Sequence, residues 1–242
     1  MERTSLGVRE AVHRRMSVRS FLPEQVPEEV IRSILEDARR APSGGNLQPW
    51  RVDVLAGDVL GKLKAIMEDR VNSGEREDPH YPVYPDKLWE PHRTYRYEVG
   101  EDMYALLGIS REDKAARVRQ MNANFQFFGA PVGLFFSTHR RFGSAQWADL
   151  GILMQTIMLL AVEQGLGTCP QEAWSFWPVT VGQFLGLSED QILFAGMAMG
   201  YPDPAASVNQ LRSRRAELEA FTSFRGFRNA APGDNGMNGP SL

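Results

Sequence analysis

Two short stretches carry side chains suited to binding an anion. Arg15, Ser17 and Arg19 alternate in "RRMSVR". Residues two apart point to the same side of an extended chain, so two guanidinium groups and a hydroxyl would converge there. That combination suits a phosphate, although a solvated surface segment would have the same composition. Arg214 and Arg215, in "RRAELEAF", offer a second and equally general anion site.

The stretch "APSGGNLQPW", residues 41–50, offers hydrogen bonds to a flat ligand. Ser43, Asn46 and Gln48 can each donate and accept. The two glycines between them allow close approach of the backbone, and Pro49–Trp50 would anchor the loop to the core. The pattern indicates a surface for the edge of a heterocycle. A turn that satisfies only its own backbone is the alternative.

Several common chemistries are missing from the sequence. It has no phosphate loop, no nucleophile elbow, no H-E-x-x-H zinc motif and no G-x-G-x-x-G dinucleotide motif. The four histidines, at positions 13, 80, 92 and 139, are scattered without metal-ligand spacing. Cys169 is the only cysteine, so no internal disulfide is expected, and its type favours a small buried side chain over a nucleophile.

Composition indicates an ordinary globular protein. The chain has 242 residues, 43% of them hydrophobic, and a formal net charge of −3, which gives no electrostatic reason to expect nucleic acid or an anionic membrane as a partner. The charged N-terminal stretch does not resemble a signal peptide, so a cytoplasmic location is expected. The apolar stretch around 146–164 contains Asp149 and Glu163 and predicts a buried helix, not a membrane span.

Alternating helices and strands are expected to position these segments. Helices are predicted at 5–14, capped by Ser5, at 27–40, starting at Pro27, and at 58–71, 110–129, 146–164 and 178–187. Strands are predicted at 50–57, 130–138 and within 191–203. The order indicates an α+β or α/β layered structure.

Residues 73–100 differ from the rest, with prolines, many charges and aromatic residues. They are predicted to form a long loop, either a lid over a site or a tolerated surface insertion. We expect one domain over 1–228, with this excursion as a possible lid, and a flexible C-terminal tail over 229–242 because of its glycine, proline and asparagine content.

Taken together, the segments "RRMSVRSF", "APSGGNLQPWRV", "NFQFFGAPVGLFF", "GLGTCPQEAW" and "FAGMAMGYPDP" resemble, in order and spacing, the FMN-dependent nitroreductase family. The resemblance covers about residues 8–226 and is greatest to the nitrobenzoate-reductase-like branch. It implies an α+β sandwich with a mostly antiparallel central sheet between helices. It also implies an intertwined homodimer with FMN at the interface, in which the helix of 146–164 lies centrally and the C-terminal segment crosses to the partner.

The resemblance also implies roles for individual residues. Arg15, Ser17 and Arg19 match the residues that hold the FMN phosphate and the pyrimidine edge, and Arg215 matches a second phosphate ligand. Pro42, Ser43 and Asn46 match a loop that reaches the flavin from the other subunit. Asn124 matches an asparagine before the "FFGAP" segment, with Asn122 as a competitor. The remaining matches, to the segment beside flavin N5, are Pro170, Gln171, Glu172 and Ala173. Met16 departs from the family pattern, in which many members have a polar residue.

The activity implied is reduction of nitroaromatics, quinones or similar flat acceptors by NADH or NADPH, in a ping-pong cycle through one pocket. No side chain is predicted to act as a catalytic acid or base, since the flavin carries the hydride. Arg19 is the candidate for stabilising negative charge on the reduced flavin. Trp174 and Trp177, next to "PQE", are candidates for lining the pocket.

Three other interpretations remain open from the sequence. One is a reductive dehalogenase of the same fold, with a charged lid over 86–102 containing Lys87, Glu90, Arg93 and Glu98. Another is a protein that binds FMN for sensing or storage without catalysis. The third is a protein that binds no flavin and uses its arginines on an unrelated anion.

Overall fold

The computed structural model describes residues 6–227. Within this range the chain divides after Arg212 into a large unit and a short C-terminal unit that contains a single helical turn, η5 (Leu218–Ala220). Ser5 and the predicted tail 229–242 lie outside the described residues. The proposed single domain over 1–228 therefore stays a prediction.

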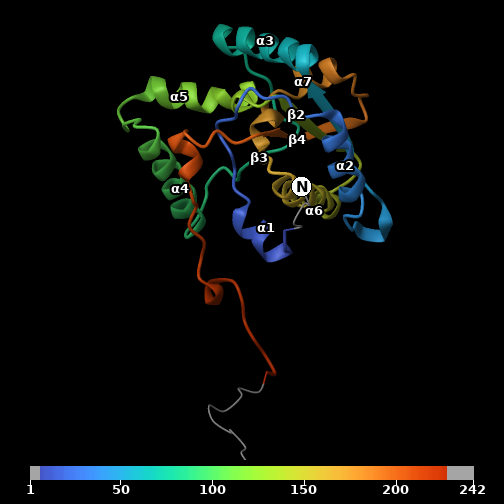
Figure 1. Cartoon of the computed structure of the whole chain (residues 1–242), viewed down its shortest axis with the longest axis vertical. Helices are drawn as coiled ribbons and strands as arrows, with labels where there is room; N and C mark the ends of the chain where they lie inside the picture. Colours follow the sequence, from blue (N-terminus) through green and yellow to red (C-terminus); the bar gives the residue numbers. More distant parts are fainter. Residues whose placement is uncertain (1–5, 228–242) are drawn as a thin grey trace, which may run out of the picture. The chain divides into compact units, whose positions relative to one another are not determined.

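Four antiparallel strands form one sheet in the order β1-β2-β4-β3 (Figure 1). The strands are β1 (Arg51–Ala56), β2 (Val132–His139), β3 (Gly167–Gln171) and β4 (Gln191–Gly200). The helices are α1 (Val8–Arg14), α2 (Glu28–Ala38), α3 (Gly57–Ser73), α4 (His92–Leu106), α5 (Lys114–Asn122), α6 (Ser144–Glu163) and α7 (Pro178–Leu185). Short 3-10 segments are η1 (Gly44–Asn46), η2 (Ala123–Gly129), η3 (Glu172–Phe176) and η4 (Ser207–Gln210).

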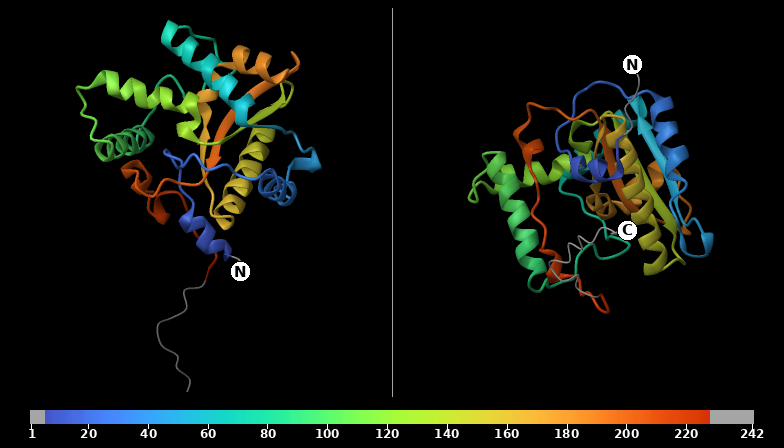
Figure 2. Two further views of the ribbon diagram at one scale, coloured as in Figure 1. Left: turned by 45° about the horizontal axis from the view of Figure 1, so that its top comes forward. Right: turned by 60° about the horizontal axis from the view of Figure 1, so that its bottom comes forward.

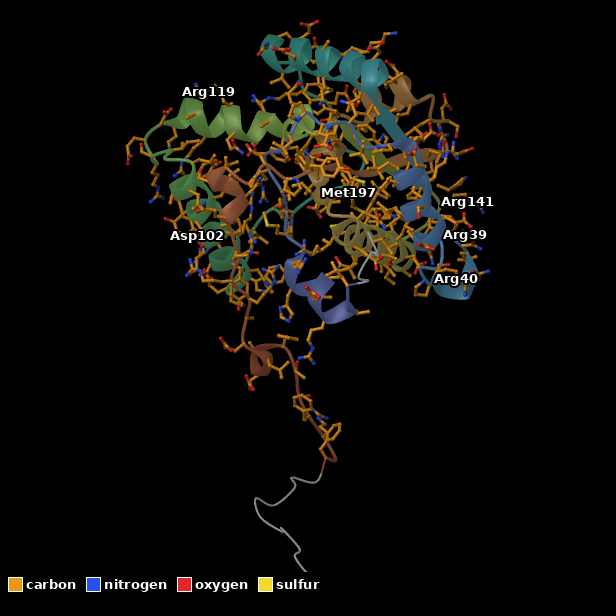
Figure 3. All side chains as sticks on the ribbon, viewed as in Figure 1. Arg39, Arg40, Asp102, Arg119, Arg141 and Met197 are labelled. Atoms are coloured by element: carbon orange, nitrogen blue, oxygen red, sulfur yellow. The ribbon has the colours of Figure 1, made fainter. Side chains whose placement is uncertain are left out.

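Each face of the sheet carries its own hydrophobic core. Alternate residues of β2 point to opposite faces, so that Leu134 and Phe136 pack with α2 and α6, while Phe135 packs with α3, η2, η3 and α7. Figure 2 shows α3 and α6 on opposite sides of the strands. In Figure 3, Met197 of β4 lies centrally, whereas Arg39, Arg40 and Arg141 lie at the periphery. The predicted α+β sandwich with a mostly antiparallel sheet is confirmed.

Helix α6 is a core helix on one of its faces. Leu150, Leu153, Ile157 and Ala161 are buried, and α6 contacts α1, α2 and β3. By length and composition alone the helix could cross a membrane, with 39% of its most apolar window buried in the fold. Packing in the core accounts for the apolar residues of the buried face, so the predicted buried helix is confirmed on that face. Its opposite face, which includes Ile152, is exposed.

Several predicted boundaries were wrong. The first helix begins at Val8 with Gly7 as its N-cap, and the second begins at Glu28 with Pro27 outside it and ends at Ala38. The helix expected over 110–129 is shorter, because α5 ends at Asn122 and the chain continues as the 3-10 segment η2, in which the buried Phe127 and Phe128 adopt left-handed backbone angles. Strand β3 was not predicted, since five residues that include Pro170 carry little strand signal.

The loop expected over 73–100 was wrong in its second half, where residues from His92 onward belong to α4. No residue of α4 is buried, so the helix lacks the apolar stripe by which sequence periodicity would reveal it. Glu90 begins the helix by accepting hydrogen bonds from the Thr94 amide and hydroxyl, at 3.3 and 2.7 Å. Arg117 of α5 fixes it with two hydrogen bonds to Glu101, at 2.6 and 3.0 Å.

Candidate functional site

The arginine-containing segment 15–19 runs alongside β3. Ser17 forms a parallel bridge with Thr168, and the Val18 amide donates to the Thr168 carbonyl at 2.9 Å. Val18 is buried, whereas Arg15, Ser17 and Arg19 are half-buried, which agrees with the alternation predicted for an extended chain. The bridge places these three residues next to the strand that leads into "PQEA".

Asn209 holds the other side of this segment, a contact that the sequence did not reveal. Its Oδ1 accepts from the Arg19 amide at 2.9 Å, and its Nδ2 donates to the carbonyls of Ser20 and Asp203 at 2.8 and 2.9 Å. The Arg19 side chain folds back, with Nη1 donating to the Ser17 carbonyl at 3.3 Å. The backbone that carries the two arginines is thus fixed on both sides before any ligand binds.

The "PQEA" segment lies where β3 ends and η3 begins, and it meets the predicted asparagine. Gln171 donates from Nε2 to the carbonyl and the Oδ1 of Asn124, at 2.7 and 3.2 Å. The Trp174 indole donates to Gln171 Oε1 at 3.3 Å. Partial burial raises the pKa of Glu172. The structure therefore brings Asn124 together with Pro170–Ala173, while the competitor Asn122 lines two cavities.

Arg15 and Arg19 place positive charge around the buried Cys169 of β3. Burial raises the pKa of the Cys169 thiol to about 11, and the two guanidinium groups act in the opposite direction without overcoming it. The thiol is therefore protonated at neutral pH and is not a nucleophile. The two guanidinium groups thus place positive charge next to β3, where it would favour binding of an anionic ligand.

Cys169 should resist thiol reagents in the folded protein. At pH 8 only about one thiol in a thousand would be ionised, and labelling should rise only as the pH approaches 11. We expect a disulfide reagent that releases a coloured thiolate to react with the single thiol in denaturant but not in the native protein. Rapid stoichiometric labelling at pH 8 without unfolding would contradict this.

The loop of Ser43 and Asn46 is tied to α6 and β2. The Gly44 amide donates to both carboxylate oxygens of the buried Asp149, each at 3.3 Å, an anchor that the sequence did not reveal. Pro49 is buried, and its carbonyl accepts from the Thr138 hydroxyl at 2.6 Å. The predicted pinning at Pro49 is confirmed.

The same loop holds strained backbone angles. Asn46 and Gln48 have φ values of 57° and 48°, and the Ser43 hydroxyl accepts from the Gln48 amide at 3.0 Å. Non-glycine residues in this region cost free energy, and such positions concentrate at ligand sites. Pro42 and Asn46 are exposed and Ser43 is half-buried, so the loop presents its polar side chains outward.

The remaining predicted residues lie in different parts of the structure. Trp174 is fully buried in the core, whereas Trp177 lines a cavity beside α5. Arg215 lies in the separate C-terminal unit, where its guanidinium donates to the Ser213 carbonyl and hydroxyl, at 3.0 and 2.6 Å. Of the charged residues considered for a lid, Glu90 and Arg93 pair with each other at the start of α4.

The excursion after α3 contacts the rest of the large unit at two points. Glu77 accepts hydrogen bonds at the N-terminus of α7, and the Tyr81 hydroxyl donates to the Phe194 carbonyl. The Tyr81 ring also contacts Trp147 and stacks on Phe194. Burial raises the pKa of Tyr81 to about 12, so its hydroxyl stays a donor at physiological pH.

The geometry defines a class of site. The Arg15–Arg19 segment, here called the cradle, is bridged to the edge strand β3, and the Asn124–Gln171 amide pair lies at the end of that strand. Among residues 6–227 there is no cluster of possible metal ligands. The Nitroreductase family model matches residues 12–201, and the chain belongs to this family.

Relatives match over most of the chain. The 4-nitrobenzoate reductase of Pseudomonas putida is 39% identical over 213 residues, which cover 88% of this chain and 93% of that protein. The crystal structure of the FMN and NADPH-dependent nitroreductase NfnB from Sphigopyxis sp. strain HMH has 44% identity and a TM-score of 0.89, covering 92% of this chain and all of that one. The FMN-dependent NfnB of Mycobacterium smegmatis, solved with NADPH, has 32% identity and a TM-score of 0.84, covering 90% and 99%.

Proposed function

We propose that this protein is an FMN-dependent oxidoreductase that uses NAD(P)H to reduce nitroaromatic and similar electron-poor flat compounds. The observation that carries the proposal is the juxtaposition of the Arg15–Arg19 segment, β3 and the Asn124–Gln171 pair in a chain of this family. Relatives at 33–39% identity over most of the chain are nitrobenzoate reductases and nitroreductases, which does not favour the dehalogenase or the sensing protein.

The residues present fit FMN. The phosphate would be held by Arg15, Ser17 and Arg19, whose stretch contains no acidic group. The ring edge would lie along Pro170–Ala173, with Asn124 supporting Gln171. When bound, FMN supplies two-electron transfer between the nicotinamide and the acceptor. Arg19 would stabilise negative charge that develops on the ring, and both substrates would use one pocket in turn.

A homodimer would complete this site. The exposed face of α6 is apolar at Ile152. Asp149 of the same helix anchors the outward-facing loop of Ser43 and Asn46. We propose that Pro42, Ser43 and Asn46 reach the flavin of the partner subunit, and that Arg215 adds a phosphate contact. A cytoplasmic location is part of the same proposal. Light scattering of the purified protein should give twice the mass of the chain.

Product analysis tests the activity. With NADPH and FMN, the protein should convert nitrobenzene to its hydroxylamine or amine, and it should not release halide from a halogenated phenol. Halide release in preference to nitro reduction would assign the chain to the dehalogenase class. FMN binding without turnover of either acceptor would indicate a sensing or storage role.

The double variant Ser43→Ala/Asn46→Ala should bind FMN about tenfold more weakly, because one or two hydrogen bonds to the flavin would be lost. Equilibrium dialysis against FMN measures this. Asn72→Ala is the matched control, since Asn72 is exposed on α3. Unchanged affinity in the double variant, with an unchanged melting temperature, would count against the partner-loop role.

A further inference from the structure

A cavity of about 530 Å³ lies beside the proposed flavin site. Most of its wall is apolar and comes from α3, α5, η2, η3 and the residue between η3 and α7: Val71, Val118, Met121, Phe125, Phe176 and Trp177. It shares Ala173 with the segment proposed to face the flavin ring, and Phe125 directly follows Asn124. The cavity is therefore suited in position and lining to a flat aromatic ligand.

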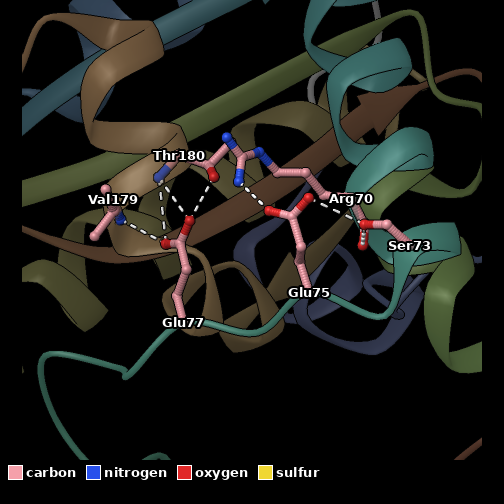
Figure 4. Close-up of polar contacts among 6 residues, drawn as sticks. All are labelled: Arg70, Ser73, Glu75, Glu77, Val179 and Thr180. Atoms are coloured by element: carbon pink, nitrogen blue, oxygen red, sulfur yellow. Dashed lines mark hydrogen bonds and ion pairs between the residues drawn. The ribbon is translucent and has the colours of Figure 1, made fainter.

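One wall of this cavity is the segment Gly74–Glu77, here called the strap. At its first end the strap is hydrogen-bonded to the last turn of α3 (Figure 4). The Glu75 amide donates to the Arg70 carbonyl at 3.1 Å. The Glu75 carboxylate pairs with the Arg70 guanidinium and accepts from the Ser73 hydroxyl at 3.0 Å. The negative charge of Glu75 is thus already compensated by Arg70 in the last turn of α3.

The other end of the strap is clamped to α7. The Glu77 carboxylate accepts from the amide of Val179 at 2.7 Å and from that of Thr180 at 3.0 Å, and it also bonds to the Thr180 hydroxyl (Figure 4). These amides form the first turn of α7, where a helix dipole favours negative charge. The charge of Glu77 is therefore also compensated.

Arg76 lies between these two fixed residues and lines the cavity. Its side chain is exposed, and it forms no hydrogen bond or ion pair with any residue in the range 6–227 that the structure describes. Both carboxylates beside it have other partners, and the exposed Asp78 lies two positions further along the chain, so among the described residues the guanidinium is left without an ion-pair partner at the rim of an apolar cavity. A guanidinium in this position suits a ligand carboxylate, which it can bind through two parallel hydrogen bonds.

We propose that Arg76 is a specificity-determining residue, which selects aromatic acceptors that carry a carboxylate in addition to the group being reduced. The aromatic ring occupies the cavity next to Ala173, and the carboxylate pairs with Arg76. This inference rests on the proposed function, because it assigns the substrate class of that site.

The test compares two acceptors that differ in charge, 4-nitrobenzoate and its methyl ester. In Arg76→Gln, the KM for 4-nitrobenzoate should rise about two- to fivefold, as expected for loss of a partly exposed ion pair, while the KM for the ester stays unchanged. Arg76→Lys should restore part of the difference. Added salt should raise the KM for the acid in the wild type more than in Arg76→Gln.

Arg119→Gln is the matched control, since Arg119 is an exposed arginine of α5 that lines the adjacent cavity but not this one. It should leave both KM values unchanged. Equal changes for acid and ester in Arg76→Gln, or no change in either, would overturn the proposal.

A binding measurement separates this proposal from the proposed function. Calorimetry with benzoate and benzamide needs no electron donor and no turnover. The wild type should bind benzoate more tightly than benzamide, and Arg76→Gln should abolish the difference. An absent preference in the wild type would overturn the role of Arg76. Failure to reduce either nitro compound, with the benzoate preference intact, would contradict only the activity.

Discussion

The double variant Arg15→Ala/Arg19→Ala is expected to lose FMN during purification, with its affinity for FMN lowered at least about 100-fold. A hydrogen bond to a charged group contributes roughly 1.5–3 kcal/mol, and each 1.4 kcal/mol is a factor of ten in affinity. Two guanidinium groups lie on a backbone fixed by Thr168 and Asn209, so little ordering cost offsets their contacts. Fluorescence titration with FMN measures the affinity.

The chain offers a matched control for this variant. Arg14 is one residue away, exposed, and paired with Glu10 on α1, so Arg14→Ala removes a charge from the same region without touching the proposed cradle. It should retain FMN. The melting temperature of the FMN-free double variant should match that of FMN-free wild type. Retention of FMN by the double variant would show that the phosphate is held elsewhere.

Replacing Gly196 with alanine is expected to cost about 2–4 kcal/mol of the free energy of unfolding, since overpacking a rigid core is strongly destabilising. A methyl group at this position of β4 would lie 2.9 Å from Cγ and Nε1 of Trp174, and closer still to Cδ1. The Trp174 ring cannot move aside easily, because it is fully buried among Phe125, Phe127 and Phe135. Urea unfolding of the FMN-free protein measures the loss.

Gly196→Ala should also weaken FMN binding, because Trp174 belongs to η3, which begins at Glu172 in the proposed flavin segment. The control is Gly61→Ala on the exposed side of α3, where a methyl group meets nothing within 4 Å. That change should be neutral or stabilise the protein by up to about 1 kcal/mol. Equal stability of the two variants would contradict the packing described here.

The sequence predicted most of the layered fold, and it named the segments from which the proposed site is built. The apolar stripe of α2 is a strong periodic signal, and the long apolar runs of α6 and β2 indicate elements that are largely apolar around the helix or on both faces of the strand. The alternation of Arg15, Ser17 and Arg19 was also predictable, since it needs only an extended backbone. These features depend on local chain geometry.

What the sequence could not show depends on contacts between distant segments. The Asp149 anchor of Gly44 spans 105 positions, the Asn209 contact with Arg19 spans 190, and the Glu77 cap on α7 spans about 100. Of these contacts, only the Asp149 anchor had a signal in the sequence. An aspartate within an apolar helix is expected to need a partner, because burial of a carboxylate requires one. Helix α4 stayed hidden because no residue of it is buried.

The most direct test is an anaerobic absorbance spectrum of the purified protein from about 300 to 600 nm, before and after NADPH or NADH and then after a nitroaromatic acceptor. We predict a flavin band that bleaches with the nicotinamide and returns when the acceptor is added. A bound flavin that neither nicotinamide bleaches would contradict the oxidoreductase. A protein without a flavin band, even after FMN is added back, would contradict the cradle at Arg15–Arg19 itself.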